Sequence, residues 1–379
     1  MVNESFPVLP FSQLVYDMTR WMPSVYTFRQ DFLIRHGAKK QEHIESALRK
    51  ALSNHPVFSS AINCKGRQYA IELKDILHGK YHDFRLKTKG DDLIIRSSVN
   101  RILGDGKSFE ILIDDILRAY EGKHLEADNF WEYLQQWEQQ QQGKHYSDSK
   151  AWLEQEFGEE SVPVRPKTDR RRIQTLLPWK AGELTVDYTD IQSDIYRLAE
   201  SEHLSLDGFF SLCVALAIMD YCGTDEAALT WAYEGRETPE EQRIIGSLHR
   251  DVAFKISRET LVGSRENVIR QARNQIRSGI AHSDYPYTLT NPHTARWNYA
   301  VNVIRQTSPK TLFANMPYDI EPLPQKPNKT AYALLDVEYY DEPDSLRLTC
   351  RYSATHYKEE SIKRFATLIR QNAEWIIER

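Results

Sequence analysis

The pattern of apolar and polar residues predicts a strand, a tight turn and a helix between residues 93 and 122. Apolar and β-branched residues dominate from Leu93 to Leu103, as in a half-buried strand. Gly104-Asp105-Gly106 then breaks the pattern with two glycines that can adopt positive φ. Ser108 stands where a helix N-cap is expected, and Gly122 where a glycine would end the helix. Helical spacing predicts one buried face on this helix, formed by Phe109, Leu112, Ile113, Ile116 and Tyr120.

The same patterns predict a mixture of helices and strands along the rest of the chain. Further helices are expected at 11–21, 42–54, 128–142, 147–157, 191–200, 206–221, 265–279 and 359–378. Further strands are expected at 26–34, 57–63, 67–73, 225–233, 252–256, 330–340 and 346–352. Ser205 is a good N-cap for the strongly apolar 206–221 helix, and Gly223 is placed to end it. The order of elements predicts an α/β protein.

Length and composition indicate a globular protein with a sizeable core. The chain has 379 residues, of which 41% are hydrophobic and 27% charged. Prolines, acids and three consecutive arginines gather near residue 165, so we expect an N-terminal lobe at 1–160, a linker at 161–175 and a C-terminal lobe at 176–379. A net charge of −5 gives no support for a nucleic-acid or anionic-membrane partner.

Several kinds of site and segment find no support in the sequence. The four cysteines have no metal-ligand spacing and no signal peptide or membrane span is recognisable, so we expect a cytoplasmic protein with reduced thiols. His78 and His82 lack a third ligand nearby and are read as a solvated loop pair, so no metal site is expected. His55 is read as a loop or helix-end residue beside Pro56.

Residues 100–106, Asn-Arg-Ile-Leu-Gly-Asp-Gly, carry the first motif with chemical content. They resemble the His-His-x-x-x-Asp-Gly signature of condensation domains in non-ribosomal peptide synthetases, which belong to the chloramphenicol-acetyltransferase-like superfamily. Asn100 and Arg101 take the two histidine positions, while Asp105 and Gly106 match the family. The similarity continues through Ser108 into the helix.

Further motifs in the family's order extend the resemblance from Pro10 to about Ile377. Gly235-Arg236, followed by Gly246 and a strand, is similar to the family's Gly-Arg motif. Residues 281–287 resemble its His-x-Asp-x-Pro-Phe motif. Trp297-Asn298-Tyr299 stands where the family has its Phe-Asn-Tyr strand, so the resemblance implies a strand at 297–299. The candidate residues of a substrate tunnel or structural pair are therefore Arg236, Gly235, Ser108, His249, His282 and Asn298. Surface or core positions remain an alternative for His249 and His282.

The resemblance implies two chloramphenicol-acetyltransferase-like lobes in a V-shaped arrangement around a central cleft or tunnel. It implies peptidyl or acyl carrier proteins as partners, which bring substrates on phosphopantetheine, so that this chain itself binds no cofactor. Asp105 is expected to form a structural ion pair with Arg236. Two alternatives are that Asp105 is only a turn and helix-cap residue, or that Arg101 competes for it.

Arg101 decides how much of the family's chemistry this chain can perform. A histidine can accept a proton near neutral pH, whereas arginine stays protonated and cannot act as that base. We therefore expect a condensation-like domain with reduced or lost amide formation that binds a carrier protein or recruits a tailoring enzyme. The alternatives are an active acyltransferase that forms an amide or ester from a carrier-tethered or CoA-linked donor, with Arg101 stabilising an oxyanion, and a stand-alone binding protein. Two fused lobes predict a monomer.

Overall fold

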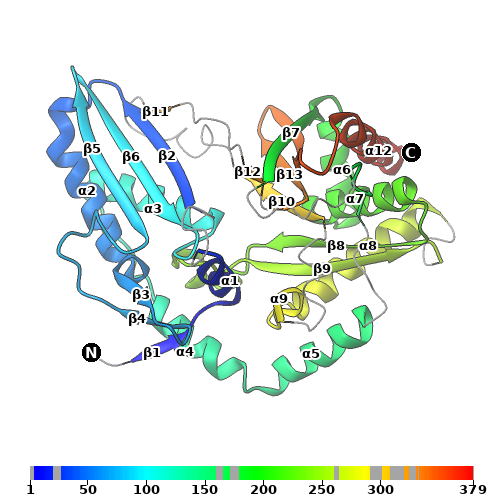
Figure 1. Ribbon diagram of the computed structural model, residues 1–379, viewed down its shortest axis with the longest axis horizontal. Helices are drawn as coiled ribbons and strands as arrows, with labels where there is room; N and C mark the ends of the chain where they lie inside the picture. The colour runs from blue at the N-terminus through cyan, green and yellow to red at the C-terminus, as the bar shows by residue number, and fades with distance from the viewer. Residues whose placement is uncertain are drawn as a thin grey trace. The chain divides into compact units, whose positions relative to one another are not determined.

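The structure, a computed structural model, describes residues 4–19, 27–158, 165–170, 179–259, 264–290, 301–307, 320–323, 330–331 and 333–378 (Figure 1). The chain divides into two compact units. The first unit comprises residues 1–143, 234–249 and 308–326, and the second comprises 144–233, 250–307 and 327–379. Each unit combines helices with antiparallel or mixed sheet, which confirms the predicted α/β class.

The described residues of the first unit form two antiparallel sheets and four α-helices. The larger sheet has the order β11-β2-β6-β5, formed by Ile320–Pro322, Thr27–Ile34, Asp92–Asn100 and His82–Lys89. The smaller sheet has the order β1-β4-β3, formed by Ser5–Pro7, Arg67–Ala70 and Ser60–Ile62. The helices are α1 (Pro10–Thr19), α2 (Gln41–Asn54), α3 (Gly106–Tyr120) and α4 (Phe130–Gln140). Ile34, Ile44 and Leu93 form an apolar cluster between β2, α2 and β6.

The second unit is built on a seven-stranded mixed sheet with the order β12-β7-β14-β13-β10-β8-β9. The strands, in chain order from β7, are Trp179–Asp187, Glu226–Tyr233, Arg250–Ser257, Asn302–Gln306, Thr330–Ala331, Leu335–Glu342 and Ser345–Ser353. The strand β10 runs parallel to both β8 and β13, and the other pairs are antiparallel. The helices are α5 (Lys144–Phe157), α6 (Gln192–Glu202), α7 (Leu206–Cys222), α8 (Arg265–Ala281), α9 (Tyr287–Thr290) and α12 (Glu359–Ile377).

The helix α7 forms the centre of the second unit's core. Every residue from Gly208 to Met219 is buried, because the helix is apolar on all sides. The Ser205 side chain accepts a hydrogen bond from the Gly208 amide, and Gly223 adopts φ 65° immediately after the helix. Both predicted ends of this helix are confirmed.

No single helix in the described parts of the chain has the length and apolar composition of a membrane span; only the bent pair 189–202 and 206–222, with 107° between its halves, passes that test jointly.

The division into units differs from the predicted boundary at 161–175. The helix α5 was assigned to the N-terminal lobe, but its Leu153 and Phe157 pack with Ala228, Ala253 and Tyr287 of the second unit. Residues 234–249 were assigned to the C-terminal lobe, but they belong to the first unit. Apolar contacts and buried ion pairs between residues far apart in the sequence thus set the division, and composition near residue 165 does not reveal them.

Three local predictions need correction. The helix α3 begins at Gly106 with Asp105 as its N-cap, one turn earlier than a cap at Ser108 implies. Its buried positions are Ser108, Ile111, Leu112, Asp115 and Ala119, of which only Leu112 was predicted. The segment 57–63 is a 3₁₀ turn at 56–59 followed by the short strand β3. The strand expected at 297–299 lies outside the described residues.

Candidate functional site

Asp105 anchors the start of α3 through a capping box. One of its carboxylate oxygens, Oδ1, accepts hydrogen bonds from the backbone amide (3.0 Å) and hydroxyl (2.9 Å) of Ser108. The Ser108 Oγ in turn accepts from the Asp105 amide at 3.2 Å. Asp and Ser are residues whose short polar side chains suit this position, because they satisfy amides that the first turn leaves unpaired.

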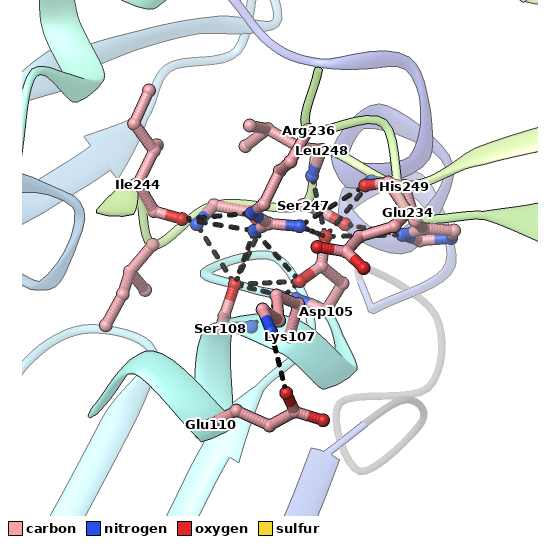
Figure 2. A network of polar contacts seen from close by, with 12 residues as sticks. Asp105, Lys107, Ser108, Glu110, Glu234, Arg236, Ile244, Ser247, Leu248 and His249 are labelled. Carbon is pink, nitrogen blue, oxygen red and sulfur yellow. Dashed lines mark hydrogen bonds and ion pairs between the residues drawn. The ribbon is translucent and has the colours of Figure 1, made fainter. Parts of the chain in front are cut away.

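Arg236 binds the same carboxylate with both terminal nitrogens. Nη1 lies 3.0 Å from Oδ2 and Nη2 lies 3.1 Å from Oδ1, and the two side chains are 0% and 3% exposed (Figure 2). The backbone amides of Leu248 and His249 also donate to Oδ2, at 2.9 and 3.0 Å. The predicted Asp105–Arg236 pair is present in the structure together with the helix cap, so the two roles coexist.

The rest of the Arg236 guanidinium organises the loop at 234–249. It donates to the carbonyl oxygens of Ile244 and Gly246, both at 3.1 Å from Nη2, and to that of Glu234 at 3.3 Å. Gly235, with φ 69°, supplies the left-handed turn just before Arg236. Burial raises the pKa of Asp105, but the positive charge of Arg236 and the surrounding hydrogen bonds outweigh it, so the pKa is lowered. The result is a fully paired buried carboxylate.

Asn100 and Arg101, which the sequence resemblance aligns with the two histidine positions, make separate contacts. The Asn100 side-chain oxygen accepts from the Ile102 amide at 3.0 Å and closes the turn after β6. The Arg101 guanidinium carbon lies 5.4 Å from the centre of the Phe11 ring. Asp105 is bound by Arg236, and no carboxylate among the described residues lies within ion-pair distance of Arg101. The expected competition of Arg101 for Asp105 therefore does not occur.

The His249 ring lies against the other side chains of this cluster. Its centre is 4.2 Å from that of Phe11 in an edge-on arrangement, and its Nδ1 is 3.9 Å from Asp105 Oδ2. Asn100, Arg101, Asp105, Ser108, Gly235, Arg236 and His249 all belong to the first unit and converge on the turn before α3.

His282 belongs to the second unit. Its ring stacks on Trp152 at 4.4 Å between centres, and its Nδ1 lies 3.2 Å from Ser149 Oγ. Partial burial and the neighbouring His145 lower the pKa of His282. Asn298 lies outside the described residues.

Sequence reasoning missed a second buried charged network, centred on His55. This imidazole is 1% exposed and lies between two carboxylates, with Nδ1 2.7 Å from Asp128 and Nε2 2.9 Å from Asp115. Arg243 forms an ion pair with Asp115, and the Ile245 amide donates to Asp128 at 3.0 Å. Burial lowers the pKa of His55, but the hydrogen bonds to Asp115 and Asp128 outweigh it and raise the pKa. The network joins α2 and α3 to the 234–249 loop.

The described residues contain no group of three or more His, Cys, Asp or Glu side chains that could hold a metal ion. The expectation that His78 and His82 are both solvated is wrong for His82, which is 4% exposed and contacts the Ile76 carbonyl at 2.7 Å. His78 is half exposed and lies 2.7 Å from Asp83.

The sequence model of the condensation domain family matches residues 80–379 of this chain. This chain belongs to the condensation domain family. Gramicidin S synthase 2 from Aneurinibacillus migulanus is 21% identical to this chain over 300 residues, and that from Brevibacillus brevis is 22% identical, in each case over 74% of this chain. The chain spans 6% of the length of these two curated relatives.

Solved structures share the fold of this condensation-family chain over its whole length. The epimerization domain from the third module of tyrocidine synthetase B superposes with a TM-score of 0.78 at 16% identity, covering 100% of this chain and 98% of that one. The X-domain from teicoplanin biosynthesis gives 0.79 at 14% identity, with 99% and 96% covered. The complex of the X-domain and OxyB gives 0.78 at 13% identity, with 99% and 94% covered. At these low sequence identities, the similarity to the solved structures establishes a shared fold and does not establish a shared function.

Proposed function

We propose that this condensation-family chain acts in non-ribosomal peptide or related natural product biosynthesis and binds intermediates tethered to a carrier protein, with reduced or lost amide-forming activity. The observation that carries the proposal is the side chain at position 101. Asp105 is held in place by a complete set of partners, while the neighbouring position that bears an imidazole in the family bears a guanidinium against Phe11. A permanently protonated group cannot take a proton from an attacking amine.

The proposed partner is a peptidyl or acyl carrier protein, which would bring phosphopantetheine with it. The X-domain from teicoplanin biosynthesis, which shares this fold, has been solved in complex with OxyB. That likeness supports a second element of the proposal, the recruitment of a tailoring enzyme. We further propose a cytoplasmic location and a monomeric state.

A working acyltransferase is the second candidate, and one observation favours it. The Arg101 guanidinium, which no carboxylate among the described residues neutralises, has N–H donors that could stabilise an oxyanion.

The test offers a carrier-loaded donor and acceptor to the wild-type chain and follows amide or ester formation by intact-protein mass spectrometry. A condensation domain with both histidines serves as the positive control. A general base usually contributes about 10²–10⁴-fold, so we expect turnover near background together with measurable carrier-protein binding. Turnover that collapses in Arg101→Ala would establish the acyltransferase instead. Robust turnover that survives Arg101→Ala would refute both candidates, and absence of carrier binding would refute the first.

A further inference from the structure

One arginine near Asp105 forms no ion pair among the described residues. The Asp105 carboxylate is already paired with Arg236 and hydrogen-bonded to Ser108 and to two further backbone amides. Lys107, on the same turn, is paired with Glu110 at 3.0 Å. Arg101, in contrast, has no ion-pair partner among the described side chains, and its guanidinium lies against the Phe11 ring.

Arg101 also has hydrogen-bonding capacity that the chain does not use. The residue is half-buried, and its guanidinium carbon lies 5.4 Å from the centre of the Phe11 ring. Contact with a ring stabilises the positive charge, but it supplies no acceptor for the five N–H donors of a guanidinium. No acceptor among the described residues meets them. A half-buried guanidinium in this state is suited to an anion with two oxygens in one plane, because the pair can form two parallel hydrogen bonds.

The surroundings of Arg101 hold it in position. The Asn100 side chain fixes the turn through the Ile102 amide, and the Ser12 hydroxyl donates to the Ile102 carbonyl at 3.0 Å. Ser12 stands next to Phe11 on α1, so the Ser12–Ile102 hydrogen bond connects the turn to the helix whose Phe11 ring contacts the guanidinium. The His249 ring packs on Phe11 as well, and its backbone amide is fixed by Asp105. A binding group held in this way loses little conformational freedom when it takes a ligand.

We propose that Arg101 binds a carboxylate on the acyl group of a thioester substrate, so that this chain selects acidic acyl intermediates. The inference rests on the proposed binding of tethered intermediates and names their chemical class. A phosphate on the pantetheine arm would offer similar chemistry from another source. A guanidinium binds either anion through two parallel hydrogen bonds, so the experiment below places the negative charge on the acyl group in one probe and on the arm in another.

The test measures binding of three probes to the full chain by isothermal titration calorimetry. S-glutaryl-pantetheine and S-pentanoyl-pantetheine have acyl chains of five carbons and differ in the terminal carboxylate. S-pentanoyl-4′-phosphopantetheine moves the negative charge to the arm. For the wild type we expect the glutaryl probe to bind on the order of tenfold tighter than the pentanoyl probe, and the preference to shrink with added salt.

Two variants assign the preference to its side chain. Arg101→Gln should abolish the preference while the pentanoyl probe binds as before, because Arg101 has no ion pair in the described structure whose loss would disturb the fold. Lys107→Gln, a control in the neighbouring first turn of α3, should keep the preference because Lys107 is already paired with Glu110.

Each remaining outcome overturns the inference in a recognisable way. Equal binding of the glutaryl and pentanoyl probes, or a preference that survives Arg101→Gln, refutes it while the proposed binding of tethered intermediates stands. An Arg101-dependent gain confined to the phosphorylated probe assigns the anion to the arm and refutes the carboxylate. If none of the three probes binds, this inference is refuted, while the separate carrier-protein binding measurement decides the proposed function.

Discussion

Replacing Arg236 with alanine should destabilise the first unit strongly. The change leaves the Asp105 carboxylate buried without its counter-charge, and it also removes the donors to the carbonyl oxygens of Ile244 and Gly246. Breaking one partner out of a buried ion pair costs about 3–5 kcal/mol. Two charge-assisted hydrogen bonds, each of about 1.5–3 kcal/mol, give a similar total.

Hydrogen exchange is the appropriate assay, because a two-unit chain need not unfold in one step. A loss of 3–5 kcal/mol corresponds to roughly a hundred- to several-thousand-fold faster exchange of the best protected amides, at about 1.4 kcal/mol per factor of ten. The effect should be largest in α3 and at the amides of Leu248 and His249, which donate to Asp105. Amides of α7 in the second unit report whether the change stays local.

Two further variants make the test decisive. Arg96→Ala removes an exposed arginine of the first unit, 65% exposed and 3.5 Å from Asp31, and should cost about 0–1 kcal/mol. Asp105→Asn in the Arg236→Ala background should restore part of the lost stability, since it removes the stranded charge and asparagine still caps a helix. If Arg236→Ala costs no more than Arg96→Ala, or if the double variant is no more stable than Arg236→Ala alone, the buried pair does not support the fold as argued.

Three other predictions follow from the same unit and from the whole chain. Because the folded-state pKa of His55 is raised, its contribution to stability is complete below about pH 6.5 and is lost as the pH rises through the folded-state pKa. The hydrogen-exchange protection of α3 should therefore fall as the pH rises in the wild type and fall less in His55→Phe, with His124→Gln, at an exposed histidine, as the control. Gly104→Ala places a Cβ 2.7 Å from Ser108 Cβ and should cost about 1–3 kcal/mol of unfolding free energy in urea, whereas Gly106→Ala, with no atom within 4 Å, should be near neutral; equal effects would contradict the packing argument. Light scattering should give the mass of a monomer, and a stable trimer would refute the reading of two lobes in one chain.

Features that depend on residues close in sequence were predictable. The cap at Ser205, the glycine after α7 and the strand pair β13–β14 follow from local patterns, and the structure contains all three. The Asp105–Arg236 pair joins residues 131 positions apart, and it was found through the resemblance to a family. No pattern in the residues themselves links those two positions.

The His55 network could not be recognised from periodicity. Asp115 and Ser108 occupy buried positions of α3 although both are polar. A face predicted from apolar residues at helical spacing therefore differs from the face that is buried in the structure. The two partners of His55 come from α3 and from the segment before α4, and residues of the loop at 243–245 bond to those two carboxylates. His55 itself is followed by a proline, which is typical of a solvated helix end. A polar residue on the inner side of an amphipathic helix was the one available signal, because such a group needs a partner when buried.

The two positions discussed most, 236 and 101, report on different properties of the molecule. Arg236 is fully buried and fully bonded, so its presence is explained by stability whether or not the chain performs a reaction. Arg101 has no ion pair among the described residues and contributes a ring contact worth about 0.5–2 kcal/mol. Loss of activity in an Arg236 variant would therefore not distinguish a catalyst from a binding domain, since either would be damaged by a disordered loop. Substitutions at Arg101 should cost no more than this ring contact, because no ion pair among the described residues is lost with them. For that reason the acyltransferase, the binding domain and the preference for acidic acyl groups can all be tested at this residue.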